Sequence, residues 1–70
     1  MNVYAFCQKC LNEEPVFKIW DCITNKFVFT GNRFSTTQCQ YAYKTVRAFA
    51  FTEQYIRIDV DSTEVTYYKP

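Results

Sequence analysis

Residues 16–30 read VFKIWDCITNKFVFT, and the fold prediction starts from them. Two runs rich in β-branched and aromatic residues, Val16–Ile23 and Phe27–Thr30, flank a short segment of Thr, Asn and Lys that is a turn signal. This pattern predicts a β-hairpin with a three-residue loop. The register matters, because a shift of one residue would move every side chain to the opposite face of the hairpin.

The three-residue loop pairs Ile23 with Phe27 and Asp21 with Phe29. One face of the hairpin then carries Phe17, Ile19, Asp21, Ile23, Phe27 and Phe29. The opposite face carries Lys18, Trp20, Cys22, Val28 and Thr30. We expect the first face to pack on the core, at the cost of placing the Asp21 carboxylate among apolar side chains.

The segments on either side of the hairpin are predicted to be a strand and a helix. Met1–Cys7 is rich in Val, Tyr and Phe, which is typical of an extended strand. Ser35–Gln38 fits a capping box, in which a Ser and a Gln three residues apart satisfy backbone N–H groups at a helix start. We therefore expect an amphipathic helix over residues 36–50. Its apolar stripe would be Cys39, Ala42, Val46, Phe49 and Ala50.

A second hairpin is predicted at the C-terminal end, where Tyr55–Val60 and Thr63–Tyr68 flank Asp61 and Ser62. Pairing Val60 with Thr63 places Ile58 opposite Val65. The outer face would then show Tyr55, Arg57, Asp59, Glu64, Thr66 and Tyr68. Asp59 and Glu64 would face each other directly, which is unfavourable for two like charges.

The predicted element order is β-β-β-α-β-β, and 70 residues allow one small core. The expected fold class is therefore α+β, with an antiparallel sheet of about five strands and one amphipathic helix packed on one face. We expect residues 1–70 to form a single compact domain. A single helix leaves the second face of the sheet uncovered, unless residues 1–14 fold over it.

Composition argues against an enzyme and predicts no cofactor. The chain has no histidine, so neither a Ser-His-Asp nor a Cys-His pair can form, and its one glycine cannot build a phosphate-binding loop. Its paired carboxylates, Glu13 with Glu14 and Asp59 with Asp61, are expected on the surface, where they keep ordinary pKa values and make poor acid catalysts near neutrality. The net charge of +1 does not indicate a dedicated nucleic-acid binder.

The four cysteines leave a metal alternative open. Cys7 and Cys10 form a C-x-x-C pair, and with Cys22 and Cys39 they supply enough thiolates for a structural zinc. However, zinc ribbons repeat the C-x-x-C pair, whereas Cys22 and Cys39 stand alone. Pro15 leaves too little room for the long helix that a thioredoxin-like site needs. We therefore expect free thiols.

The uncovered sheet face is the candidate binding site. Its expected partner-binding residues are Lys18, Trp20, Tyr55, Arg57 and Tyr68. Trp, Tyr and Arg dominate interface hot spots, so we expect the partner to be another protein, with a homodimer through this open face as one form. The alternative partner is single-stranded nucleic acid, whose bases would stack on the rings.

Neither a membrane-spanning stretch nor a signal peptide is predicted, and the default expectation is a cytoplasmic protein. In overall style the chain is similar to the short, self-contained proteins with which phages block host enzymes, anti-CRISPR proteins among them. The points of similarity are its small size, a start directly in a strand, the absence of catalytic residues and a surplus of surface aromatics. That resemblance implies an inhibitor of a host protein complex.

Overall fold

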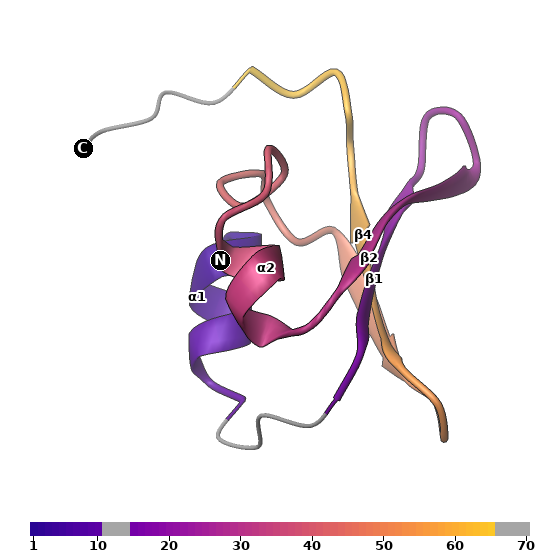
Figure 1. Cartoon of the computed structure of the whole chain (residues 1–70). Helices are drawn as coiled ribbons and strands as arrows, with labels where there is room; N and C mark the ends of the chain where they lie inside the picture. The colour runs from indigo at the N-terminus through magenta and orange to yellow at the C-terminus, as the bar shows by residue number, and fades with distance from the viewer. Residues whose placement is uncertain (11–14, 66–70) are drawn as a thin grey trace.

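A computed structural model describes residues 1–10 and 15–65 and has an α+β fold (Figure 1). Its elements are α1 (Val3–Gln8), β1 (Phe17–Asp21), β2 (Lys26–Gly31), α2 (Arg33–Thr37), β3 (Ala48–Phe51) and β4 (Ile56–Val60). The four strands form one sheet in the order β2-β1-β4-β3. Both helices lie on the same side of this sheet, so the described chain forms two layers (Figure 1).

The sheet is mixed rather than antiparallel. Strand β1 pairs antiparallel with β2 and parallel with β4, and β4 pairs antiparallel with β3. Both edges of β4 are therefore occupied. This corrects the predicted C-terminal hairpin, because Thr63–Val65 has no free edge of β4 to join, and Val65 is 77% exposed instead of lying opposite Ile58. Residues 66–68 of that hairpin lie outside the described residues.

The predicted repulsion between Asp59 and Glu64 is also wrong. The Glu64 carboxylate accepts hydrogen bonds from the Thr45 backbone N–H at 2.8 Å and from the Thr45 hydroxyl at 2.6 Å. Asp59 instead binds Arg57. The two carboxylates therefore have separate partners, and each lies on a different segment of the fold.

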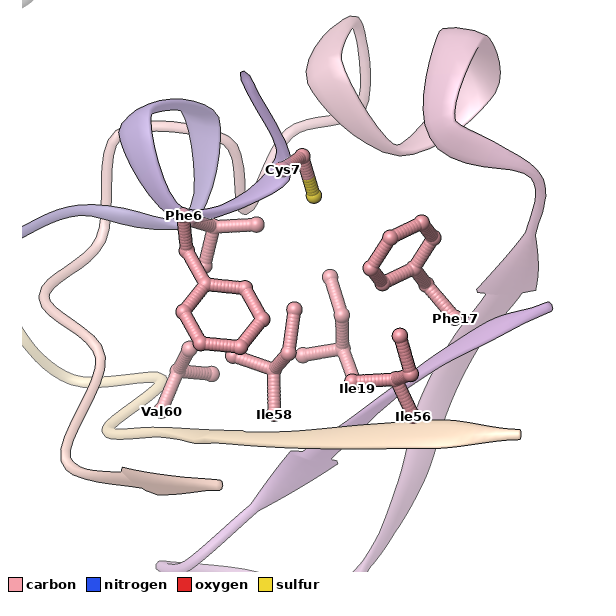
Figure 2. Close-up of a cluster of buried hydrophobic side chains, with 8 residues drawn as sticks. Phe6, Cys7, Phe17, Ile19, Ile56, Ile58 and Val60 are labelled. Atoms are coloured by element: carbon pink, nitrogen blue, oxygen red, sulfur yellow. The ribbon is translucent and has the colours of Figure 1, made fainter. Parts of the chain in front are cut away.

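The core lies between α1 and the two central strands. Alternate residues of β1 and β4 are buried, as expected for strands with one covered face. The buried cluster consists of Val3, Phe6, Cys7, Phe17, Ile19, Ile56, Ile58 and Val60. Figure 2 shows Phe6 and Cys7 of α1 above the side chains of β1 and β4.

The N-terminal segment forms a helix instead of the predicted strand. Asn2 is the N-cap residue, and its side-chain oxygen accepts a hydrogen bond from the Ala5 N–H at 2.8 Å. Val3, Phe6 and Cys7 follow at helical spacing and are all buried. The cap and this short stripe outweigh the β-type composition of the segment.

The predicted helix over residues 36–50 is wrong as well. Asn32, not Ser35, caps α2, and this helix ends at Thr37. The segment after α2 makes turn-type hydrogen bonds, such as that from Ala42 N–H to the Cys39 carbonyl. The chain then continues into β3. The run Ala-Phe-Ala-Phe at residues 48–51 alternates with period two, and as a strand it pairs with β4. Strand pairing thus overrides the helical stripe that we read through Phe49 and Ala50.

The first hairpin exists, but its register differs from the predicted one. The loop has four residues, 22–25, and Asn25 adopts a left-handed conformation with φ of 57°. Ile19 lies opposite Phe29, whereas the next residue, Trp20, lies opposite Phe27. The bulge between these pairs turns Phe27 to the face of Trp20. Val28, expected on that face, packs against the core instead.

Gly31, at the end of β2, is required by close packing. A Cβ atom at this position would collide with the Ser35 hydroxyl of α2 and would lie 2.9 Å from the Phe29 ring. The only glycine of the chain therefore stands where a side chain would be crowded by both α2 and the neighbouring ring of β2.

Asp21 shows how the predicted cost of a buried carboxylate is met. It is 1% exposed, and its oxygens accept hydrogen bonds from Ile23 N–H at 3.0 Å, Thr24 Oγ1 at 2.7 Å and Ser62 N–H at 3.1 Å. Burial alone would raise the pKa of Asp21, but these hydrogen bonds together hold it well below its usual range. Asp21 therefore ties the first hairpin to the segment that follows β4.

A lowered carboxyl pKa makes the fold sensitive to acid. The contribution of Asp21 to stability is complete above the ordinary carboxyl pKa of about 4 and is lost as the pH falls from there through the lowered value. We expect Asp21→Asn to be less stable than the wild type at neutral pH and to lose less stability on acidification. Denaturant unfolding measured at intervals from about pH 7 to pH 2 checks this. Parallel profiles for the two proteins would contradict the role of Asp21.

The position of β4 can be tested with two aliphatic residues. Ile58 is fully buried at the centre of the sheet, so Ile58→Ala should cost about 2–5 kcal/mol, a large part of the stability of a small domain. Val65→Ala should change stability by less than about 0.5 kcal/mol. Thermal or denaturant melts measure both. Equal losses would instead favour the hairpin in which Ile58 and Val65 pair.

Candidate functional site

The face of the sheet turned away from the helices carries the candidate site (Figure 1). The intervening residues of β1 and β4, between the buried ones, point to this side. Register places Lys18 beside Arg57 and Trp20 beside Asp59. We call Lys18, Trp20, Phe27, Tyr55 and Arg57 the outer-face cluster.

Three aromatic rings form the frame of the outer-face cluster. The Trp20 and Phe27 ring centroids are 5.0 Å apart, with an interplanar angle of 81°. Phe27 in turn meets Tyr55 edge-on at 6.0 Å and 89°. Such edge-to-face pairs are favourable aromatic geometries, worth about 0.5–1.5 kcal/mol each beyond burial. The rings therefore hold one another in fixed orientations across β1, β2 and the start of β4.

Two cations complete the outer-face cluster. The Lys18 ammonium lies 4.7 Å from the Tyr55 ring centroid and 5.4 Å from that of Phe27. The Arg57 guanidinium carbon lies 4.7 Å from the Trp20 ring centroid. All three distances suit cation–π attraction, and each cation joins two strands of the sheet: Lys18 of β1 reaches Phe27 of β2, and Arg57 of β4 reaches Trp20 of β1.

Asp59 fixes the position of Arg57. The carboxylate accepts hydrogen bonds from Arg57 Nε at 2.7 Å and from Nη2 at 3.2 Å, a two-point contact. The hydrogen bond to Asp59 raises the pKa of Arg57, so the guanidinium stays charged. Arg57 is therefore held from below by the indole and from the side by a carboxylate, while 38% of its side chain remains exposed.

Four of the five predicted partner-binding residues come together here: Lys18, Trp20, Tyr55 and Arg57. Tyr68, the fifth, lies outside the described residues. Sequence reasoning missed Phe27, which is 41% exposed and contacts both Trp20 and Tyr55. The predicted three-residue loop places Phe27 on the core face, because nothing in the local sequence pattern marks the bulge that turns it to the outer face.

One alternative places residues 1–14 over this face of the sheet. The N-terminal helix does not lie there. Helix α1 lies on the core side of the sheet, where Val3, Phe6 and Cys7 are buried (Figure 2). Residues 1–10 therefore leave the outer-face cluster uncovered.

The cysteines are distributed over both ends of the fold. Cys7 is buried on the core side of α1, Cys10 and Cys39 are half-buried beside the core, and Cys22 is exposed in the first hairpin loop. Burial raises the pKa of Cys7 to about 12, and the nearby Cys10 and Cys39 add to this effect. Within residues 1–10 and 15–65, no group of three or more metal-ligating side chains is arranged to hold an ion. The four cysteines of the zinc alternative thus do not converge.

These environments predict different thiol reactivities. At about pH 8 a thiol with a pKa of about 12 is ionised in only about one molecule in ten thousand, and the thiolate is the reactive form. We expect iodoacetamide to label Cys22 readily in the native protein and Cys7 only after unfolding. Peptide mapping by mass spectrometry measures both sites. Labelling of native Cys7 at the rate of Cys22 would contradict the buried position.

Within the described part of the chain, the helices are too short to cross a membrane. Comparison of the chain with protein-family models, with curated proteins and with solved structures finds no match. The proposals below therefore rest on the geometry of this molecule.

Proposed function

We propose that the chain is a non-enzymatic binding module that docks on another protein through the outer-face cluster. The observation that carries this proposal is the set of cation–π and aromatic contacts that joins Lys18, Trp20, Phe27, Tyr55 and Arg57 on the sheet face turned away from α1 and α2. Rings and guanidinium groups that are held in place before binding lose little conformational freedom on binding. Trp, Tyr and Arg are also the usual hot-spot residues.

The charges favour a protein partner over single-stranded nucleic acid. A base would need an open ring face for stacking, yet Arg57 already lies over Trp20, and Lys18 lies over Tyr55. Asp59 also neutralises part of the positive charge of Arg57, which weakens the attraction of this surface for phosphate groups. Nucleic acid stays the second candidate, because the two cations and three rings are still gathered on one surface.

We further propose that this binding inhibits a host protein complex. The basis is the similarity in style to the short proteins with which phages block host enzymes. One of the features behind that similarity, a start directly in a strand, is replaced by α1. The small size and the exposed rings remain as its support.

A matched pair of ring deletions tests the use of this face. Trp20→Ala should weaken binding to the protein partner by about 30-fold or more, which corresponds to about 2 kcal/mol. Phe34→Ala removes a ring that is 68% exposed on α2, in the opposite layer, and should leave binding unchanged. Proteins are captured from a lysate on the wild type and on each variant. A protein that is lost on Trp20→Ala but retained on Phe34→Ala is the candidate ligand. Titration of that purified protein then measures its affinity for the wild type and both variants.

Trp20 is the only tryptophan, so its fluorescence reports directly on the site during these titrations. An oligonucleotide titrated in the same way distinguishes the second candidate. Nucleic-acid binding should weaken steeply with salt, with a log–log slope of about −0.7 per phosphate contact. A steep slope together with tight oligonucleotide binding would replace the protein-binding proposal.

A further inference from the structure

Strand β3 has an exposed outer edge. It is the end strand of the sheet, and its sequence Ala-Phe-Ala-Phe carries no charge. Eight consecutive residues, 47–54, are all exposed, and Phe49 and Phe51 are 55% and 65% exposed. Edge strands are usually protected by charged residues, proline or a bulge, because their free N–H and C=O groups pair readily with another strand. Residues 48–51 have none of these protections.

The other end strand, β2, is different. It begins with Lys26 and contains the bulge at Val28, which interrupts the regular ladder. An uncharged edge with a regular register is therefore found at β3 and not at β2. Pairing between β3 and another β3 is consequently favoured over head-to-tail pairing of β3 with β2, which would build open filaments.

The two faces of β3 differ in chemistry. Phe49 and Phe51 lie opposite Ile58 and Ile56, so both rings are on the core side of the sheet. There the Phe49 ring is 5.1 Å from Phe6 and 5.6 Å from Phe51. Ala48 and Ala50 lie on the outer face, where their small side chains leave the edge open.

A hollow of about 370 Å³ lies beside these rings, between α1 and β3. It is lined by Met1, Phe6, Lys9, Cys10, Phe49 and Phe51. Its lining is mostly apolar, so it suits an aromatic ring from the chain that pairs with β3.

Residues 47–53, Arg-Ala-Phe-Ala-Phe-Thr-Glu, are complementary to themselves when read in opposite directions. Antiparallel pairing centred on Ala50 joins residues whose numbers add to 100, and because this sum is even, paired side chains lie on the same face of the sheet. Phe49 then meets Phe51 of the second copy, and Ala50 meets its own counterpart. At the two ends, Arg47 meets Glu53 of the second copy, so opposite charges face each other twice.

We propose that β3 is a homodimer interface, in which two copies pair antiparallel through this strand about a two-fold axis at Ala50, with Arg47 of each copy beside Glu53 of the other. The partner strand is β3 of a second copy, because β3 and its flanking residues supply both members of every pair: Phe49 with Phe51, Ala50 with Ala50, and Arg47 with Glu53. Such an isologous contact closes on itself and joins the two four-stranded sheets into one. This interface is separate from the outer-face cluster and does not depend on its function.

Ala50→Glu tests the centre of the interface. In the single chain Ala50 lies opposite Arg57, so a carboxylate there has a cation as neighbour and should not disturb the monomer. In the dimer the two introduced carboxylates would face each other at the axis. We expect the wild type to dimerise with rising concentration over about 1–300 µM in sedimentation velocity, and Ala50→Glu to remain monomeric with an unchanged melting profile.

A charge exchange tests the register. Arg47→Glu and Glu53→Arg should each weaken dimerisation by about tenfold at low salt, since each creates two like-charge pairs by symmetry. The double variant should recover the wild-type dimer. Arg47 and Glu53 flank β3 at its opposite ends, so a rescue must come from contact between two copies. The charge of Arg47 also acts on Asp61 and Glu64, and circular-dichroism melts therefore accompany each variant.

Three results would overturn the proposal. The first is a wild type that stays monomeric over the whole concentration range. The second is a dimer that persists in Ala50→Glu but is lost in Trp20→Ala, which would place self-association on the outer-face cluster. The third is a double charge variant without recovery, or growth into open polymers in place of a closed dimer.

Discussion

Strands β1 and β4 run parallel at the centre of the sheet, and their register places Phe17 beside Ile56 and Ile19 beside Ile58. Parallel neighbours cannot be joined by a tight turn, so the chain between them must cross over the sheet. That crossover, residues 22–55, supplies β2, α2 and β3. The end strands and one helix of the covering layer therefore lie in a single crossover, and because its last strand, β3, takes the other edge of β4, a terminal hairpin on β4 is excluded.

The same register builds the candidate site. Because side chains alternate along a strand, burying Ile19 and Ile58 forces Lys18 and Trp20 of β1 to the outer face together with Arg57 of β4. Parallel pairing then brings these side chains from distant parts of the sequence within cation–π distance. A slip of one residue would destroy core and cluster together, so the surface chemistry is as firmly specified as the core.

Period-two alternation in β1 and β4 allowed the α+β class and the outer placement of Lys18, Trp20 and Arg57 to be predicted. Elements that depend on distant partners could not be predicted in this way. The stripe through Phe49 and Ala50 suits a helix locally, and only the free edge of β4 makes it a strand. Phe27 was misplaced because a bulge is a feature of pairing that single-strand patterns do not record. The Asn2 cap of α1 was a readable signal that was overlooked.

The two proposals together constrain the geometry of the ligand. A two-fold axis perpendicular to a sheet leaves each face on its own side, so dimerisation through β3 would place both outer-face clusters on the same side of one continuous sheet. The two β3 strands would lie between the two clusters. Their outer-face residues, Ala48 and Ala50, are small enough to leave that surface unobstructed. A partner that spans both clusters would gain the effective concentration of a second, linked contact. The ligand best matched to such a surface is therefore a protein that presents two copies of the same epitope.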